Sequence, residues 1–191
     1  MKRFGVILLL FVLSPVFTKA QFSLLPSVGV QIPVGSFSSD NYLGTDFGGS
    51  LALKYGITES FDMGLSLGYH RFSYSMEKQI NAIIPIAVTL EKRFGYYAFK
   101  PMIGFDAGIY NFYHTEKTTN DTYSLNPTVT DTKMGIAPVV GFYVDLSESY
   151  SFCTMAKYHY ACDDAKACTY VGLNVGLNIR FLPSNPGYSR F

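Results

Sequence analysis

Tryptophan is absent from this chain of 191 residues, cysteine occurs only three times, and charged residues make up only 15%. With this length, the chain is too long to be a small fold held together by disulfides. The formal net charge of +1, without a basic run, gives no electrostatic support for nucleic acid as a partner. With 48% hydrophobic and 16% aromatic residues, the chain is too apolar to be disordered, and its length allows one domain.

A hydrophobic segment long enough to cross a bilayer as a helix is also lacking. An apolar run, Gly5–Leu13, follows Lys2 and Arg3 and precedes Thr18-Lys19-Ala20. A spanning helix needs about 20 apolar residues, so the short run and the small residues after it are typical of a cleaved secretory signal peptide. We therefore expect residues 1–20 to be removed on export.

Apolar stripes with the period of a helix are missing too, and alternation takes their place. From Val171 to Phe181 every second residue is apolar, and the residues between them are glycine, asparagine or arginine. Successive side chains of a strand point to opposite faces, so this pattern predicts one apolar and one polar face. Seven similar segments precede it. The eight expected strands are Ser27–Val34, Phe47–Tyr55, Phe61–Phe72, Ala82–Arg93, Ala98–Phe112, Met134–Asp145, Tyr150–Tyr160 and Thr169–Phe181.

The connections between these strands alternate in length. Residues 56–60, 94–97 and 146–149 form short connections, whereas Gly35–Asp46 and Tyr113–Lys133 are longer and polar. Short turns at one end and longer loops at the other are typical of outer-membrane barrels, with the short turns in the periplasm. We predict an all-β fold, an eight-stranded antiparallel up-and-down transmembrane β-barrel over residues 21–181, followed by a short periplasmic tail at 182–191.

A soluble barrel or sandwich, as in lipocalins, would show the same alternation, but two details favour the membrane. Glycine crowds the polar face, where it suits the interior of a small barrel better than an open solvent face. These glycines are Gly64, Gly68, Gly104, Gly108, Gly135, Gly141, Gly172 and Gly176. Tyrosines near strand ends are typical of aromatic girdles at membrane interfaces. These tyrosines are Tyr69, Tyr96, Tyr97, Tyr110, Tyr158 and Tyr160.

The last expected strand ends in a regular pattern of polar, glycine and hydrophobic residues. Asn174, Gly176, Ile179 and Phe181 match a polar residue, a glycine two positions later, and hydrophobic residues at positions six and eight. This segment resembles the C-terminal signal of the outer-membrane β-barrel family of Gram-negative bacteria, and the chain is similar in size to porin-like barrels of the OmpA/OmpX type. The resemblance implies an outer-membrane location, outer-membrane lipid as a partner, and the barrel-assembly machinery as a partner during insertion. It leaves any extracellular partner unspecified.

Residue patterns for catalysis or metal binding are not apparent. The three histidines, His70, His114 and His159, have no serine two positions away on the same strand face, and no His/Cys cluster has ligand spacing. No glycine-rich segment opens a helix that would hold a phosphate. We therefore expect no catalytic, cofactor or metal site, and a protein that is not an enzyme.

The cysteines leave two alternatives. Cys162 and Cys168 flank the last outer connection, and an exported chain meets oxidising conditions. A disulfide across this hairpin is one alternative and two free thiols are the other, because symmetric pairing would put the two strands out of phase by one residue. Cys153 is expected to be a buried, unpaired thiol.

The polar face also collects charges of both signs. An eight-stranded barrel is only wide enough for side chains to fill its interior, so these charges are expected to pair. The expected lumen network contains Lys54, Glu91, Arg93, Asp106, Lys157 and Arg180. We predict an integral outer-membrane protein with a structural or cell-surface interaction role and a plugged lumen. The alternatives are a narrow pore for small solutes and a soluble, lipocalin-like secreted carrier.

Overall fold

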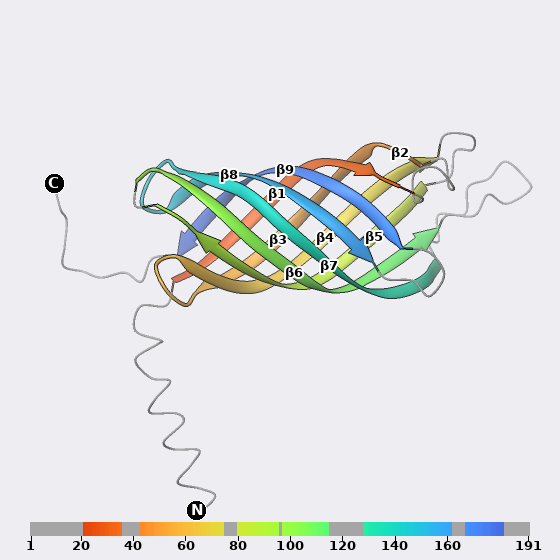
Figure 1. Ribbon diagram of the computed structural model, residues 1–191, viewed down its shortest axis with the longest axis horizontal. Coiled ribbons are helices and arrows are strands. Elements are labelled where there is room, and N and C mark those ends of the chain that lie inside the picture. The colour runs from red at the N-terminus through yellow and green to blue at the C-terminus, as the bar shows by residue number, and fades with distance from the viewer. Residues whose placement is uncertain are drawn as a thin grey trace, which may run out of the picture.

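The computed structural model describes residues 21–35, 43–74, 80–95, 97–114, 128–161 and 167–181, which form a closed antiparallel β-barrel (Figure 1). Its strands are β1 (Gln21–Pro33), β2 (Leu43–Gly44), β3 (Asp46–Gly56), β4 (Phe61–Tyr74), β5 (Ile80–Arg93), β6 (Phe99–His114), β7 (Thr128–Asp145), β8 (Tyr150–Ala161) and β9 (Cys168–Phe181). The pairings of β4 with β5 and of β1 with β9 close the ring. Because β2 is a two-residue strand beside the end of β4, eight strands make the wall, and the predicted fold is confirmed.

The two ends of the barrel differ, and we name them by their connections. At the turn end, β3–β4, β5–β6 and β7–β8 are joined, and β1 begins beside the end of β9. Two of these turns close in the same way: the hydroxyl of Thr58 accepts a hydrogen bond from the amide of Phe61, and that of Ser147 from the amide of Tyr150. At the opposite end, which we call the loop end, β4, β6 and β8 end and β5, β7 and β9 begin. The expected signal peptide and tail, residues 1–20 and 182–191, lie outside the described residues. Within the described ranges, no helix is long and apolar enough to span a bilayer.

The largest differences from the predicted strand boundaries lie at the start of β1 and at the connection of β6 with β7. β1 begins at Gln21 rather than Ser27, because the alternation of exposed and buried side chains already starts at Phe22, which pairs with Tyr55 on one side and Phe181 on the other. The predicted loop Tyr113–Lys133 is too long, since β6 continues to His114 and β7 begins at Thr128. β-Branched threonines in this part of β7 suit a strand, and a register shift at Phe112/Tyr113 accommodates the pairing.

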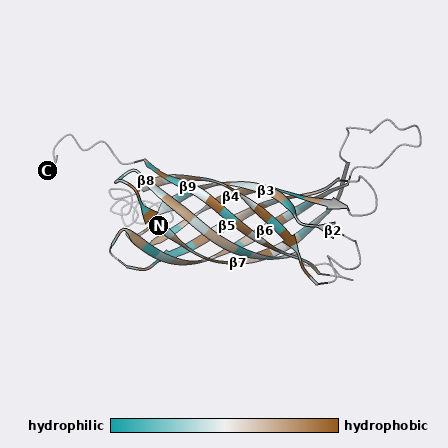
Figure 2. Ribbon diagram, turned by 90° about the horizontal axis from the view of Figure 1, so that it is seen from above, coloured by the Kyte–Doolittle hydropathy of each residue, from teal (hydrophilic) through white to brown (hydrophobic). Residues whose placement is uncertain are grey.

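Most of the exposed side chains on the outward face of the barrel are apolar, and hydrophobic and hydrophilic residues alternate along the strands (Figure 2). Aromatic rings meet at the turn end, where the centroids of Phe22 and Tyr55 are 5.2 Å apart. Of the tyrosines expected in interface girdles, those exposed are Tyr69, Tyr97, Tyr158 and Tyr160, while Tyr96 lies outside the described residues. Tyr110 does not belong to a girdle: it shares the inward parity of Asp106 and is buried in the lumen.

The lumen is filled by side chains in two apolar clusters. The cluster nearer the turn end contains Leu25, Ala52, Met102, Val139, Tyr143, Cys153 and Met155. The other cluster, which we call the loop-end cap, contains Phe72, Ile83, Tyr110, Phe112, Ala161, Cys168 and Tyr170. Glycines leave room for the inward side chains: a Cβ at Gly135 would lie 2.5 Å from the Tyr110 ring, and one at Gly172 would lie 2.6 Å from Gln31 Oε1.

Candidate functional site in the barrel lumen

A buried triangle of polar groups spans the turn-end half of the lumen. Lys54 Nζ donates hydrogen bonds to Glu91 Oε2 at 2.6 Å and to the Tyr143 hydroxyl at 2.7 Å. The same hydroxyl donates to Glu91 Oε2 at 3.0 Å. These groups come from β3, β5 and β7, and Gly64, opposite Lys54 on β4, has no side chain in the way. The ammonium and the carboxylate therefore neutralise each other out of contact with solvent.

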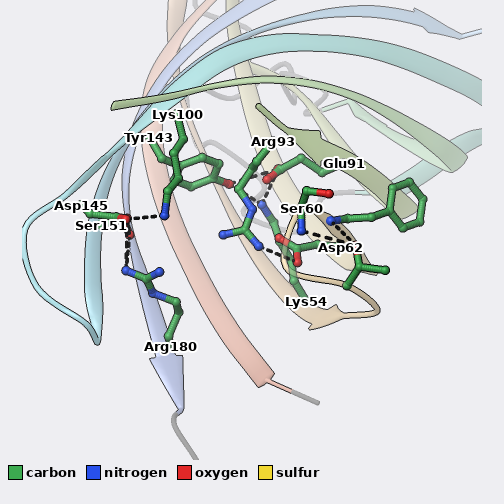
Figure 3. Close-up of polar contacts among 12 residues, drawn as sticks. Lys54, Ser60, Asp62, Glu91, Arg93, Lys100, Tyr143, Asp145, Ser151 and Arg180 are labelled. Atoms are coloured by element: carbon green, nitrogen blue, oxygen red, sulfur yellow. Dashed lines mark hydrogen bonds and ion pairs between the residues drawn. The ribbon is translucent and has the colours of Figure 1, made fainter. Parts of the chain in front are cut away.

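Two further groups of charges lie nearer the turn end (Figure 3). Arg93 pairs with Asp62 at 2.9 Å and lies over the Tyr143 ring, with 5.9 Å from its Cζ to the ring centroid. Asp145 pairs with both Lys100, at 2.5 Å, and Arg180, at 3.1 Å. The Asp145 carboxylate also accepts a hydrogen bond from Ser151, which in turn accepts one from Arg180. Each arginine on the inward face of these strands thus has a carboxylate partner.

One ion pair lies midway along the lumen. Lys157 Nζ is 2.7 Å from Asp106 Oδ2, and the Asp106 side chain is only 4% exposed. Lys157 lines two neighbouring cavities, one shared with Lys54 and Glu91 and the other with Asp106 and His159. Each cavity holds about 10 Å³, which is about the space of one water molecule. Neither of these two spaces is large enough for a small-molecule ligand.

A layer of histidine and tyrosine side chains lies on the loop-end side of this ion pair, and its two tyrosines, Tyr110 and Tyr170, also belong to the loop-end cap. His70 Nδ1 is 2.7 Å from the Tyr170 hydroxyl, and His159 Nδ1 is 3.0 Å from the Tyr110 hydroxyl. The His159 ring stacks on Tyr170, with centroids 4.3 Å apart and planes 10° apart. Sequence reasoning missed this layer, although His159 and Tyr170 are register partners on β8 and β9 and could have been found by aligning those strands.

All six residues of the expected network point into the lumen, and the structure joins four of them into two pairs, Lys54–Glu91 and Asp106–Lys157. Arg93 and Arg180 instead pair with Asp62 and Asp145. The register of β4 against β5 could have indicated Asp62, because it lies directly opposite Glu91. The register of β6 against β7 could likewise have indicated Lys100, which lies opposite Tyr143, two residues from Asp145. Tyr143 carries no comparable signal in the sequence, since its partner Lys54 lies on β3, which is distant along the chain.

The residues of the expected assembly signal divide between the two faces. Asn174 is buried and accepts a hydrogen bond from Gln31 Nε2 at 3.2 Å, and Gly176 faces the lumen beside Ser27. Ile179 and Phe181 point outward, and Phe181 is 54% exposed at the turn end. The two outward residues therefore present an apolar surface at the end of β9.

Two of the three cysteines lie within the described residues. Cys168 is buried and lies in register with Ala161, whereas Cys162 lies outside the described residues, so the expected disulfide stays a prediction. Cys153 is free and buried beside Tyr143, its register partner on β7. Across the described ranges, no three His, Cys, Asp or Glu side chains come close enough together to hold a metal ion.

Comparison with known proteins identifies the fold. The sequence matches no protein-family model and no curated protein. Among solved structures, the barrel is similar to Neisserial surface protein A, with a TM-score of 0.66 and 11% identity over 85% of this chain and 99% of that one. It is also similar to a major outer membrane protein from Thermus thermophilus, with a TM-score of 0.56 and 12% identity over 85% and 99%.

A third similar structure is Ail, the attachment invasion locus protein of Yersinia pestis, in complex with the heparin analogue sucrose octasulfate. Its TM-score is 0.54 at 13% identity, over 85% of this chain and 99% of that one. This chain thus has the fold of eight-stranded outer-membrane β-barrels, as the sequence resemblance implied. The fold alone does not decide between a structural role, ligand binding and catalysis, because one fold supports many functions.

Proposed function

We propose that this protein is an integral outer-membrane β-barrel with a structural or cell-surface interaction role, and that its lumen is closed to ions and solutes. The observation that carries the proposal is the pairing of charges inside the barrel. Lys54 with Glu91 and Lys157 with Asp106 bring opposite charges together where side chains fill the interior. A charge-selective channel would instead need a row of one sign facing water.

The outward face supports the membrane location. Side chains such as Phe47, Leu65 and Ile103, which are 74%, 62% and 52% exposed, would be costly to leave in water over a whole barrel surface. Lipid contact removes that cost, and a closed ring of strands satisfies the backbone without an edge. We therefore propose outer-membrane lipid as the surrounding partner, the assembly machinery as the partner during insertion, and no nucleic-acid partner.

The packing of the lumen argues against the two alternative functions, a narrow pore and a lipocalin-like carrier. A narrow pore needs a continuous path, whereas the loop-end cap fills one half of the lumen with buried rings such as Phe72 and Tyr170, both 0% exposed. A lipocalin-like carrier needs a ligand cavity of roughly 300 Å³ or more. The two cavities around Lys157 hold about 10 Å³ each.

We also propose that the protein is not an enzyme. The histidine–tyrosine layer is buried in the lumen, and the cavity beside it holds about 10 Å³. A substrate would have no room next to His70 or His159. Any extracellular partner would therefore meet the loop end rather than the interior.

The location and the assembly signal are tested together by fractionation. We expect the wild-type protein in the outer-membrane fraction, with a gel mobility that changes on heating because the barrel resists detergent. Phe181→Ala is expected to lower the amount of assembled barrel several-fold without altering export, because it removes the exposed aromatic at the end of β9.

Phe105→Ala is the matched control, since Phe105 is another outward aromatic, 41% exposed, in the middle of β6. It removes a similar apolar area away from the C-terminal strand and should assemble close to the wild-type level. Equal assembly of wild type and Phe181→Ala would contradict the signal, and wild-type protein in the soluble periplasmic fraction would contradict the location.

A further inference from the structure

The histidine–tyrosine layer joins four strands through side chains that are all uncharged when the imidazoles are neutral. His70 comes from β4, Tyr110 from β6, His159 from β8 and Tyr170 from β9. The ring centroids of the two histidines lie 5.1 Å apart in an edge-to-face arrangement. Both histidines are 3% exposed, so the layer connects strands in the loop-end half of the barrel with almost no contact with solvent.

Among the described residues, the groups around the two imidazoles include no anion without a cation partner. Asp106 lines the same cavity, where Lys157 pairs with its Oδ2 and its Oδ1 has no hydrogen-bond partner among the described residues. Lys157 itself is two residues from His159 on the same face of β8. His159 Nε2 is buried and has no hydrogen-bond partner within the described chain. A proton on His159 would place a second positive charge beside that of Lys157. This charge would also lie next to the His70 ring.

In the described parts of the other strands, no compensating charge lies at this level. The titratable group that remains there is Cys168 of β9, and the inward residues nearest the layer on β1, β3, β5 and β7 are Gln31, Gly48, Ile83, Pro85 and Gly135. Toward the loop end, Asp46 is paired with Arg71 at 3.1 Å, and Lys133 is paired with Asp131 at 3.2 Å. The described carboxylates that could approach the layer are therefore already engaged by cations.

We propose that the His70–His159 pair makes the loop-end half of the barrel sensitive to acid. Imidazole is the side chain that gains a charge near pH 6–7, and a charge buried without a partner is costly. On acidification, the two imidazoles take up protons in the opened or unfolded barrel. In the folded barrel, the packed layer excludes these protons. Because the unfolded state then binds more protons, the stability of the barrel falls as the pH falls. This inference does not depend on whether the lumen conducts.

The test compares pH profiles of stability for purified barrel in lipid vesicles. The midpoint of urea unfolding is measured from pH 8 to pH 5 for the wild type and for His70→Asn/His159→Asn, in which each amide can replace the hydrogen bond of Nδ1. In the wild type, the unfolding equilibrium constant is expected to rise about tenfold or more between pH 7.5 and pH 5.5, as the linkage of even one excluded proton requires. In the double variant, most of this rise should disappear.

His114→Asn is the matched control, because His114 is the third histidine of the chain and lies at the end of β6, outside this layer. It should keep the wild-type profile. Should the double variant fail to fold, the ring-nitrogen NMR shifts of wild-type His70 and His159 replace it and are expected to stay those of neutral imidazole at pH 5.5 in the folded barrel. Equal pH profiles for the wild type and the double variant, or imidazoles that gain a proton in an intact barrel, would overturn the proposal.

Discussion

Replacing Asp106 by alanine is expected to lower the free energy of unfolding of the barrel by about 3–5 kcal/mol. Asp106 pairs with Lys157 at 2.7 Å in the middle of the lumen, where the two side chains are 4% and 11% exposed. The substitution leaves the ammonium of Lys157 buried without its carboxylate, and Glu91 is already held by Lys54 and Tyr143. An uncompensated charge, rather than the loss of one contact, causes most of the expected effect.

Asp131→Ala provides the matched control. Asp131 also pairs with a lysine, Lys133, at 3.2 Å, but its side chain is 53% exposed at the loop end of β7. Exposed ion pairs contribute about 0–1 kcal/mol, so this second Asp→Ala change should shift the urea midpoint little. Similar losses of stability in the two variants would contradict the buried ion pair at the centre of the lumen.

Gly108→Val is expected to destabilise the barrel by at least about 3 kcal/mol or to prevent refolding. Gly108 lies in β6, and a Cβ there would overlap the backbone carbonyl oxygen of Ile86 and the Cα of Ala87 on β5. Backbone atoms cannot move aside as a flexible side chain can, so the two strands would have to separate. The β5–β6 ladder, which runs from Asn81↔His114 to Arg93↔Met102, would be interrupted at its centre.

Gly49→Val on β3 is the comparison for this prediction, because Gly49 is on the outward face. A Cβ at Gly49 would lie 3.2 Å from the carbonyl oxygen of Ser27 and 3.8 Å from Val28 Cγ1. Valine suits a strand that faces apolar surroundings, so this variant should refold with a smaller loss of stability. Refolding yield and urea midpoint measure both variants, and equal effects would contradict the close approach of β5 and β6 at Gly108.

Alternation of apolar and polar residues was sufficient to predict the number of strands and their faces. In β9, the residues from Val171 to Phe181 alternate as the sequence indicated, because lipid and lumen impose opposite polarity on neighbouring side chains. Strand ends were predicted less well. The mostly polar segment Thr128–Lys133 was predicted to be part of a loop, but it forms a strand because its backbone pairs with β6.

The partners inside the lumen required information that one sequence does not contain. Lys54 and Glu91 were predicted to face inward, but their meeting depends on the register of three strands. Tyr143 was overlooked because its hydroxyl accepts a hydrogen bond from Lys54, which lies 89 residues away along the chain. The contact of His70 with Tyr170 was missed for the same reason, since it joins β4 to β9, which are not neighbouring strands.

Single-channel recording of the purified wild-type protein in a planar lipid bilayer tests the closed lumen most directly. Because the loop-end cap and the paired charges fill the interior, we predict that the current stays at the level of the bare bilayer, apart from rare and brief openings. The protein must first be shown to be inserted, by its resistance to protease and its change in gel mobility on heating. Steady, long-lived conductance steps from such inserted protein would contradict the closed lumen and favour the narrow pore.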